Sequence, residues 1–208
     1  MLRKFLFLWG MALAMLFVVN ANFSVCEAGG FQKLYEVRHV SDTLRSDGAW
    51  KKSFNTMNGE IKLQFRKVSS EGSDKRFHFT VKLGKNYVYK NHFPDVEGGY
   101  SIMVVKDTNT SRIFFVVQSM ERAYMYGYEE KSKRFEIYID SQNYLNRYNG
   151  CPRIAVLRNG DLVLAFEPAY ANYVAHNQRY SFFWDQRSLW FAYKDLGGGF
   201  SSVDRDAV

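Results

Sequence analysis

Alternation of apolar and polar side chains with a period of two constrains the fold of this chain more than any other feature. Segment 60–66, EIKLQFR, places its apolar side chains on one face and its charged or amide side chains on the other. Segment 76–83, RFHFTVKL, has the same pattern, which is typical of antiparallel strands with one buried face. From Gly29 onward no 3.6-residue period persists over ten residues, so we expect an all-β fold.

Other segments predict further strands. The continuous apolar runs Ser101–Val105 and Ile113–Val117 are expected of strands that are covered on both faces. Further candidates rich in Tyr, Phe, Val and Ile are 123–129, 134–140, 153–157, 162–166, 180–184 and 189–194. Asn58-Gly59 joins candidate strands 53–57 and 60–65, and Asn159-Gly160 joins 154–157 and 161–166, so each predicts a type I′ hairpin. Together these signals predict an antiparallel meander of about a dozen strands.

A weak internal repeat relates residues 101–140 to residues 153–195. Segment 130–140, EKSKRFEIYID, matches segment 185–195, DQRSLWFAYKD, without a gap, and an apolar run precedes each copy. Each copy is expected to form two hairpins, a four-stranded unit like a propeller blade. Closed propellers have four to eight blades, whereas this chain offers three at most. A β-sandwich, a barrel and a propeller-like stack of four-stranded units therefore all stay open.

Composition indicates one folded domain. The 208 residues are 47% hydrophobic and 17% aromatic, which excludes a disordered chain, and two Cys exclude a disulfide-dense scaffold. No linker is visible, so residues 29–196 are expected to form a single all-β domain, followed by a flexible tail over 197–208. Residues 42–52 are expected to hold a short helix or an irregular loop, and residues 91–94 a loop.

The first 28 residues predict a secretory signal peptide. Arg3 and Lys4 precede an uncharged apolar run from Phe5 to Val19, which is shorter than the roughly 20 residues that span a bilayer. Small residues allow cleavage after Ala21 or after Ala28. The expected localisation is periplasmic, cell-surface or extracellular. The alternative is a membrane anchor, either through the uncleaved segment or through a lipid on Cys26.

Export also decides how the cysteines are interpreted. Cleavage after Ala21 leaves Cys26 and Cys151, which could form a disulfide, whereas cleavage after Ala28 leaves Cys151 alone. Nothing near Cys151 in the sequence lowers the pKa of its thiol, so it is not assigned catalysis.

Positive charge is concentrated before residue 101. Residues 31–100 hold 13 Lys and Arg against 8 Asp and Glu, whereas residues 101–208 hold 13 against 12. A basic exported surface could meet anionic envelope polymers or lipid headgroups, and an envelope glycan or a protein is also a possible partner. The competing interpretation, which we favour at this point, is that lysines on the solvent face of strands provide solubility and discourage edge pairing. Export and the absence of a recognised module argue against nucleic acid as a partner.

No sequence motif for metal binding, cofactor binding or nucleophilic catalysis is present. The residue types that could bind a ligand lie in the long polar and aromatic segment 169–178 and beside the next hairpin turn, where tyrosine and tryptophan can stack on sugars or peptides. The weak ligand-binding candidates are Tyr170, Asn172, Tyr173, His176, Trp184 and Trp190.

These observations favour an exported, non-catalytic β-protein of the cell envelope or extracellular space that binds a glycan, peptide or protein. One alternative is a secreted hydrolase that uses carboxylates such as Asp140 and Asp195. The other is a structural or assembly subunit with an exposed sheet edge.

Overall fold

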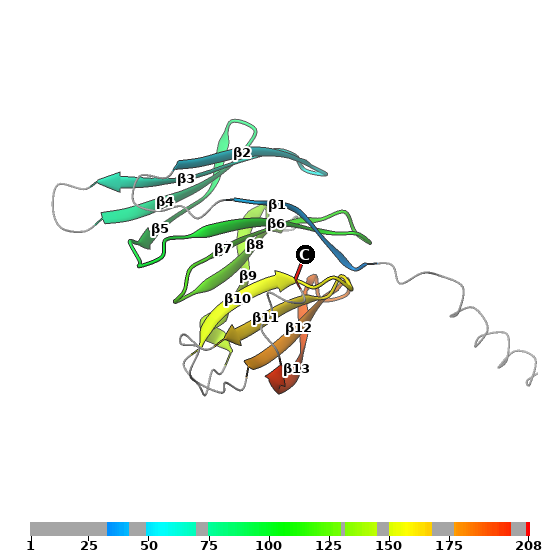
Figure 1. Cartoon of the computed structure of the whole chain (residues 1–208). Coiled ribbons are helices and arrows are strands. Elements are labelled where there is room, and N and C mark those ends of the chain that lie inside the picture. Colours follow the sequence, from blue (N-terminus) through cyan, green and yellow to red (C-terminus); the bar gives the residue numbers. More distant parts are fainter. Residues whose placement is uncertain are drawn as a thin grey trace, which may run out of the picture. The chain divides into compact units, whose positions relative to one another are not determined.

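The computed structural model of the protein describes residues 33–41, 49–69, 75–129, 132–144, 150–167, 177–200 and 207–208. Within these ranges, thirteen strands form three antiparallel sheets, which can be followed by colour in Figure 1. The predicted all-β fold, an antiparallel meander of about a dozen strands, is confirmed. The 28 residues expected to form the signal peptide lie outside the described residues, as do residues 42–48. Residues 49–52, for which the sequence predicts a short helix or an irregular loop, instead begin the strand Ala49–Thr56, because they pair with residues 63–66.

Each sheet is built almost entirely from strands that are consecutive in the chain. The first sheet consists of β2 (Ala49–Thr56), β3 (Gly59–Ser69), β4 (Lys75–Leu83) and β5 (Asn86–Pro94). The middle sheet, in spatial order, consists of β1 (Tyr35–Val40), β6 (Ser101–Asp107), β7 (Ile113–Gln118), β8 (Ala123–Glu129) and β9 (Arg134–Asp140). The short 3-10 helix η1 (Ser141–Asn143) follows β9. The third sheet consists of β10 (Cys151–Val156), β11 (Leu162–Glu167), β12 (Asn177–Asp185) and β13 (Trp190–Phe200).

The middle sheet is buried on both faces because its residues alternate between two hydrophobic cores. In β6, Ile102 and Val104 belong to the core shared with the first sheet, whereas Met103 and Val105 belong to the core shared with the third. In β7, residues 114–117 are all buried and divide between the two cores in the same way. The prediction that these two segments are covered on both faces is therefore confirmed.

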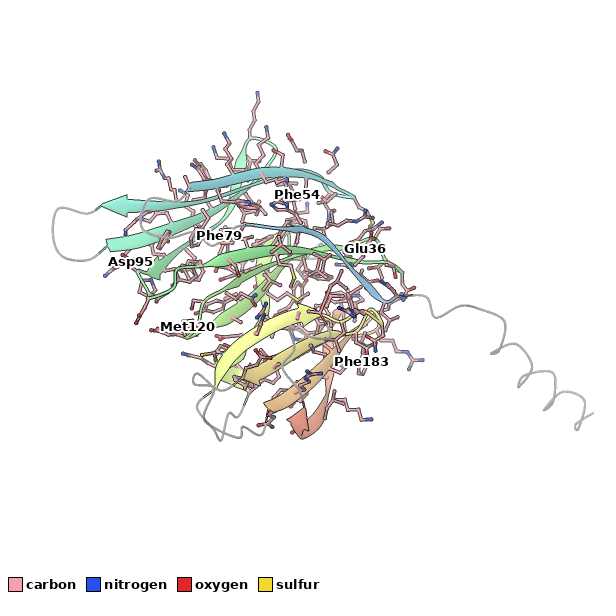
Figure 2. The ribbon with its side chains drawn as sticks, in the orientation of Figure 1. Glu36, Phe54, Phe79, Asp95, Met120 and Phe183 are labelled. Atoms are coloured by element: carbon pink, nitrogen blue, oxygen red, sulfur yellow. The ribbon has the colours of Figure 1, made fainter. Side chains whose placement is uncertain are left out.

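Aromatic side chains fill much of both cores. The rings of Phe65 and Phe77 stack at a centroid distance of 4.9 Å, and Phe79 contacts Tyr126 of the middle sheet at 5.4 Å. In the other core Phe114 packs against Phe191 of the third sheet at 5.0 Å. Phe54 and Phe79, labelled in Figure 2, belong to the core between the first and middle sheets. The high aromatic content thus serves packing of sheet on sheet.

Two strands were not predicted. β5 includes residues 91–94, which the sequence assigns to a loop because Asn91 and Pro94 are poor strand formers. Pro94 is tolerated because it is the last residue of an edge strand. β1 escapes recognition because a register shift between Val37 and His39 interrupts its alternation.

Both predicted Asn-Gly hairpins are present, but the predicted type I′ turn is wrong in each. Thr56 pairs with Gly59, so Met57 and Asn58 are the central residues of the first turn. Only the glycines, Gly59 at φ 107° and Gly160 at φ 90°, have a positive φ. A type I′ turn needs positive φ at both central residues, so the glycine follows each turn here and takes the left-handed position itself.

The two copies of the predicted repeat form successive four-stranded meanders, β6–β9 and β10–β13. In the last hairpin of each copy, the strand pairing places equivalent loop residues one position away from where the gapless sequence alignment places them. Glu129 pairs with Arg134 and Asp185 with Trp190, each across four loop residues. Each starting carboxylate accepts a hydrogen bond from the backbone N–H of the serine three residues later. Tyr138, the extra residue of a bulge in β9, restores the predicted alignment after the loop. Duplication itself stays a prediction.

The chain end departs from the expected flexible tail. β13 continues through residues 197–200 by pairing with the start of β12. Gly197, at φ 75°, lies beside the register shift that this pairing requires, where a residue with a side chain would be strained. Ala207 forms an isolated bridge with Leu157, and the backbone N–H of Val208 donates to the carbonyl of Val156.

Candidate functional site

The outer face of the first sheet, opposite its core face, concentrates cationic and polar side chains. Residues of β3 and β4 alternate, so that the side chains between the buried positions point away from the core. We call this surface the basic face; its residues are Lys51, Ser53, Lys62, Gln64, Arg66, Arg76, His78, Thr80, Lys82, Tyr87, Lys90 and His92. Figure 2 shows nitrogen-tipped side chains projecting from this side of the sheet.

The segment that forms the first sheet accounts for the whole net charge of the chain. Residues 49–94 contain ten Lys and Arg and three Asp and Glu, a balance of +7, while the other residues contain 18 of each sign. Within the described part of this segment, Glu60 is the one acidic residue. Its carboxylate lies 3.0 Å from the Lys62 ammonium, and the hydrogen bond from Lys62 lowers the pKa of Glu60. The face is therefore electropositive as a unit.

One row of the basic face surrounds Tyr87 with cations. Across the strands Ser53 pairs with Lys62, Lys62 with Lys82, and Lys82 with Tyr87. The Lys82 ammonium lies 4.1 Å from the centroid of the Tyr87 ring, and that of Lys90 lies 4.4 Å away. Hydrogen bonding and charge from Lys82, with smaller effects of Lys90 and Arg66, lower the pKa of Tyr87. These contacts hold two flexible ammonium groups at defined positions on the face.

A second row joins three strands through Arg66, His78 and His92, which are register partners. The two imidazoles stack almost in parallel, with centroids 4.1 Å apart and an interplanar angle of 6°. His78 is half-buried and His92 is exposed. Partial burial, the adjacent His92 and the charge of Arg66 all lower the pKa of His78. His78 is consequently uncharged at neutral pH.

Between these rows lies a third one, in which Lys51 and Lys90 flank two uncharged side chains. Gln64 and Thr80 occupy the central positions of this row. Amide and hydroxyl groups can donate hydrogen bonds to an anion without adding repulsion between cations. The three rows together offer charge and hydrogen-bond donors suited to an extended anion, and no arrangement typical of an acid–base or nucleophilic centre.

Four of the predicted ligand-binding residues belong to segment 169–178. Tyr170, Asn172, Tyr173 and His176 lie outside the described residues, so their role in binding stays a prediction.

The two predicted tryptophans lie beside the same hairpin turn, as expected, but in different surroundings. Trp184 is half-buried against Phe114 and Phe191, and the Arg112 guanidinium lies 4.8 Å from its ring centroid. Trp190 is 42% exposed and packs one side on Tyr138 at 4.7 Å. Trp184 thus extends the core, whereas one side of Trp190 stays exposed, and the role of both residues in binding stays a prediction.

Cys151 forms no disulfide with another described residue, and it lines a cleft of about 280 Å³ together with Arg153 and Glu167. Burial and the charge of Glu167 raise the pKa of Cys151, so the thiol stays protonated at neutral pH. Cys26 lies outside the described residues, and the proposed disulfide with it stays a prediction.

The carboxylates considered for hydrolysis make local hydrogen bonds. Asp140 accepts from Arg122 Nε at 3.2 Å and Nη2 at 2.8 Å, and also caps η1 through the backbone N–H of Gln142. Asp195 accepts from the backbone N–H of Gly197 at 2.8 Å. The loop residue Asp185 accepts from the backbone of Arg187 and Ser188, which lowers its pKa. These contacts stabilise turns and strand ends.

Sequence reasoning placed several of these cations on the solvent side of strands but did not assemble them into a site. The missing step was β5, which brings His92 beside His78 and Lys90 beside Thr80. A usable signal was present in the sequence: the whole charge excess falls within residues 49–94, which also contain two alternating strand patterns.

Among the described residues, no three His, Cys, Asp or Glu side chains gather as metal ligands would. The described ranges also contain no helix with the length and hydropathy needed to cross a membrane. No protein-family model, no curated protein and no solved structure matches this chain significantly.

Proposed function

We propose that this protein is an exported, non-catalytic β-protein that binds an anionic polymer of the cell envelope or extracellular space through its basic face. The observation that carries the proposal is that residues 49–94 hold the full net charge of +7 and display much of it on one sheet face. The predicted signal peptide in residues 1–28 supports an extracytoplasmic partner.

A soluble polymer fits this face better than a lipid bilayer does. Surfaces that bind membranes combine cations with apolar side chains that enter the headgroup region. In the described basic face the exposed large ring is Tyr87, and two ammonium groups lie close to it. The remaining side chains are charged or form hydrogen bonds, which suits an anion that stays hydrated.

Binding of this kind is expected to weaken with salt, because each contact between a cation and the polymer releases counterions. We would measure the binding of long-chain inorganic polyphosphate to the protein, expressed with its own N-terminal segment, over a series of salt concentrations. Replacing Lys51, Lys82 and Lys90 with Gln should reduce the salt slope by roughly two, at about 0.7 per lost contact as in single-stranded nucleic acids.

The matched control replaces Arg134, Arg187 and Lys194 with Gln, because these exposed residues lie in the other two sheets or in a hairpin loop of the third, and their loss changes the net charge equally. The control should bind like the unmodified protein. Equal weakening in both variants would mean that net charge, and not the basic face, attracts the polymer. Binding to phosphatidylglycerol vesicles without binding to polyphosphate would replace the polymer with a membrane.

A further inference from the structure

Resting on the proposed function, we infer that the row Arg66–His78–His92 is a proton-dependent site for a phosphate group of the anionic polymer. The bound phosphate lies across the row, and its binding is coupled to the uptake of protons from solvent. The basic face thus has a permanent set of cations and a second set that exists only in acid or with ligand.

The geometry of the row favours a compact anion with several oxygens. Arg66, His78 and His92 stand directly opposite one another on three adjacent strands, which are spaced about 4.8 Å apart. Arginine binds phosphate through two parallel hydrogen bonds, and an imidazolium donates from both ring nitrogens. The tetrahedral phosphate centre spreads its oxygens in different directions toward the three side chains, whereas both oxygens of a carboxylate lie in one plane.

The stacked imidazoles are uncommitted within the described structure. The rings contact each other, and no hydrogen bond joins either ring to another described residue. Two imidazolium ions with centroids 4.1 Å apart repel each other, so an empty row does not readily hold both protons. An anion that touches both rings offsets this repulsion.

The charged and polar groups around the pair are basic or neutral on every adjoining strand. On β3, Arg66 faces His78 directly, with Gln64 two residues away along the strand. On β5, Lys90 and Pro94 flank His92, and on β4 itself Arg76 and Thr80 flank His78. The described acidic residue of this sheet, Glu60, pairs with Lys62 near the opposite end of β3. No described carboxylate of the face therefore substitutes for the ligand.

Partial burial and the charge of Arg66 lower the pKa of His78, so this imidazole adds no positive charge to the row at neutral pH. By linkage, a ligand that prefers the protonated pair binds more tightly as the pH falls, and its binding draws protons from solvent. Histidine is the side chain whose charge changes in the range between pH 5 and 8.

The test is a calorimetric titration of the protein with polyphosphate at pH 7.5 and at pH 5.5. Buffers of different ionisation enthalpy reveal how many protons are taken up on binding. The same titrations are carried out on the double variant H78Q/H92Q. The unmodified protein should bind about tenfold more tightly at pH 5.5 and take up protons near neutral pH. The double variant should lose both effects while it still binds polyphosphate through the permanent cations of the basic face.

Two controls make the result specific. His39→Gln, which removes a half-buried histidine in the middle sheet, should leave proton uptake unchanged. Titration with inorganic phosphate tests whether the row binds free phosphate. Titration with hyaluronate tests whether a polymer of carboxylates binds in the same way as a polymer of phosphates. Equal pH dependence with hyaluronate, or pH dependence that survives in H78Q/H92Q, overturns the inference. Binding of polyphosphate without proton uptake also overturns the inference, but the proposed function then still stands. Failure to bind any polyanion at either pH removes the proposed function as well.

Discussion

Gly160 is the glycine on which the described structure depends most directly. Its φ is 90°, and an added Cβ would lie 2.6 Å from the Cα of Lys33, at the start of the segment that leads into β1. The Gly160 carbonyl also accepts a hydrogen bond from the backbone N–H of Tyr35 at 3.0 Å. Gly160 therefore provides both the backbone conformation that the turn needs and the space for a close contact between two segments far apart in sequence.

We expect Gly160→Ala to lower the free energy of unfolding by about 3 kcal/mol, because backbone strain and the clash with Lys33 add together. Gly84→Ala is the matched control, since Gly84 also has a positive φ, 60°, but no atom lies within 4 Å of the added Cβ. The control should cost about 1 kcal/mol. Urea denaturation measures both, and equal costs would show that the contact with Lys33 is unimportant.

His78 should make stability depend on pH. Because its pKa is lower in the folded state, the unfolded chain binds its proton first, and stability falls as the pH drops through about 6.5. His78→Gln removes this contribution, so urea denaturation between pH 7.5 and 5.5 should show a shallower loss of stability in the variant. An unchanged pH profile would contradict the assignment.

At the scale of the element, Tyr35 anchors strand β1 to the third sheet. Its side chain is 2% exposed, and its hydroxyl accepts a hydrogen bond of 2.8 Å from the backbone N–H of Trp184 in β12. This one contact joins residues 149 positions apart in the chain. Burial, the largest influence, raises the pKa of Tyr35, so the hydroxyl stays protonated.

Tyr35→Phe should reduce the free energy of unfolding by about 1–2 kcal/mol, because the Trp184 N–H loses its partner while the ring still fills its place. Tyr193→Phe, at a ring that is 55% exposed, is the comparison and should have little effect. Thermal unfolding of both variants provides the measurement. A neutral Tyr35→Phe variant would mean that water replaces the lost hydroxyl.

The sequence predicts those strands whose hydrophobic pattern lies within the strand itself, and misses those that depend on pairing with a distant segment. Alternation revealed β3 and β4, and continuous apolar runs revealed β6 and β7, because both patterns lie within a single strand. β1 and β5 lack a clean local pattern and owe their existence to pairing with β6 and β4. The row Arg66–His78–His92 needed three strands in register, so no single segment could disclose it.

At the scale of the whole molecule, the middle sheet couples the other two. Phe115 and Val116 are neighbours in β7, yet Phe115 belongs to the core with the first sheet and Val116 to the core with the third. A loss of packing on one face therefore acts on a strand that supports both cores. Unfolding of the three sheets is expected to be a single cooperative transition.

Val116→Ala should lower the free energy of unfolding by about 2 kcal/mol through the cavity it leaves, and Trp50 should report the change although it lies in the other core. Coincident denaturation curves from Trp50 fluorescence, in a variant with Trp9, Trp184 and Trp190 replaced by Phe, and from far-UV circular dichroism would show this. Met120→Ala, at a side chain that is 52% exposed, is the neutral control. Separate transitions would show that the first sheet unfolds independently.

The position of the charge gives the molecule a direction. The basic face is the side of the first sheet that points away from the middle sheet. The third sheet packs on the opposite side of the middle sheet. Attachment to a polyanion through the basic face would turn the third sheet outward in every copy. In a polymer coated with this protein, every copy would then present the outer face of its third sheet, including the exposed ring of Phe183 in β12, to its surroundings.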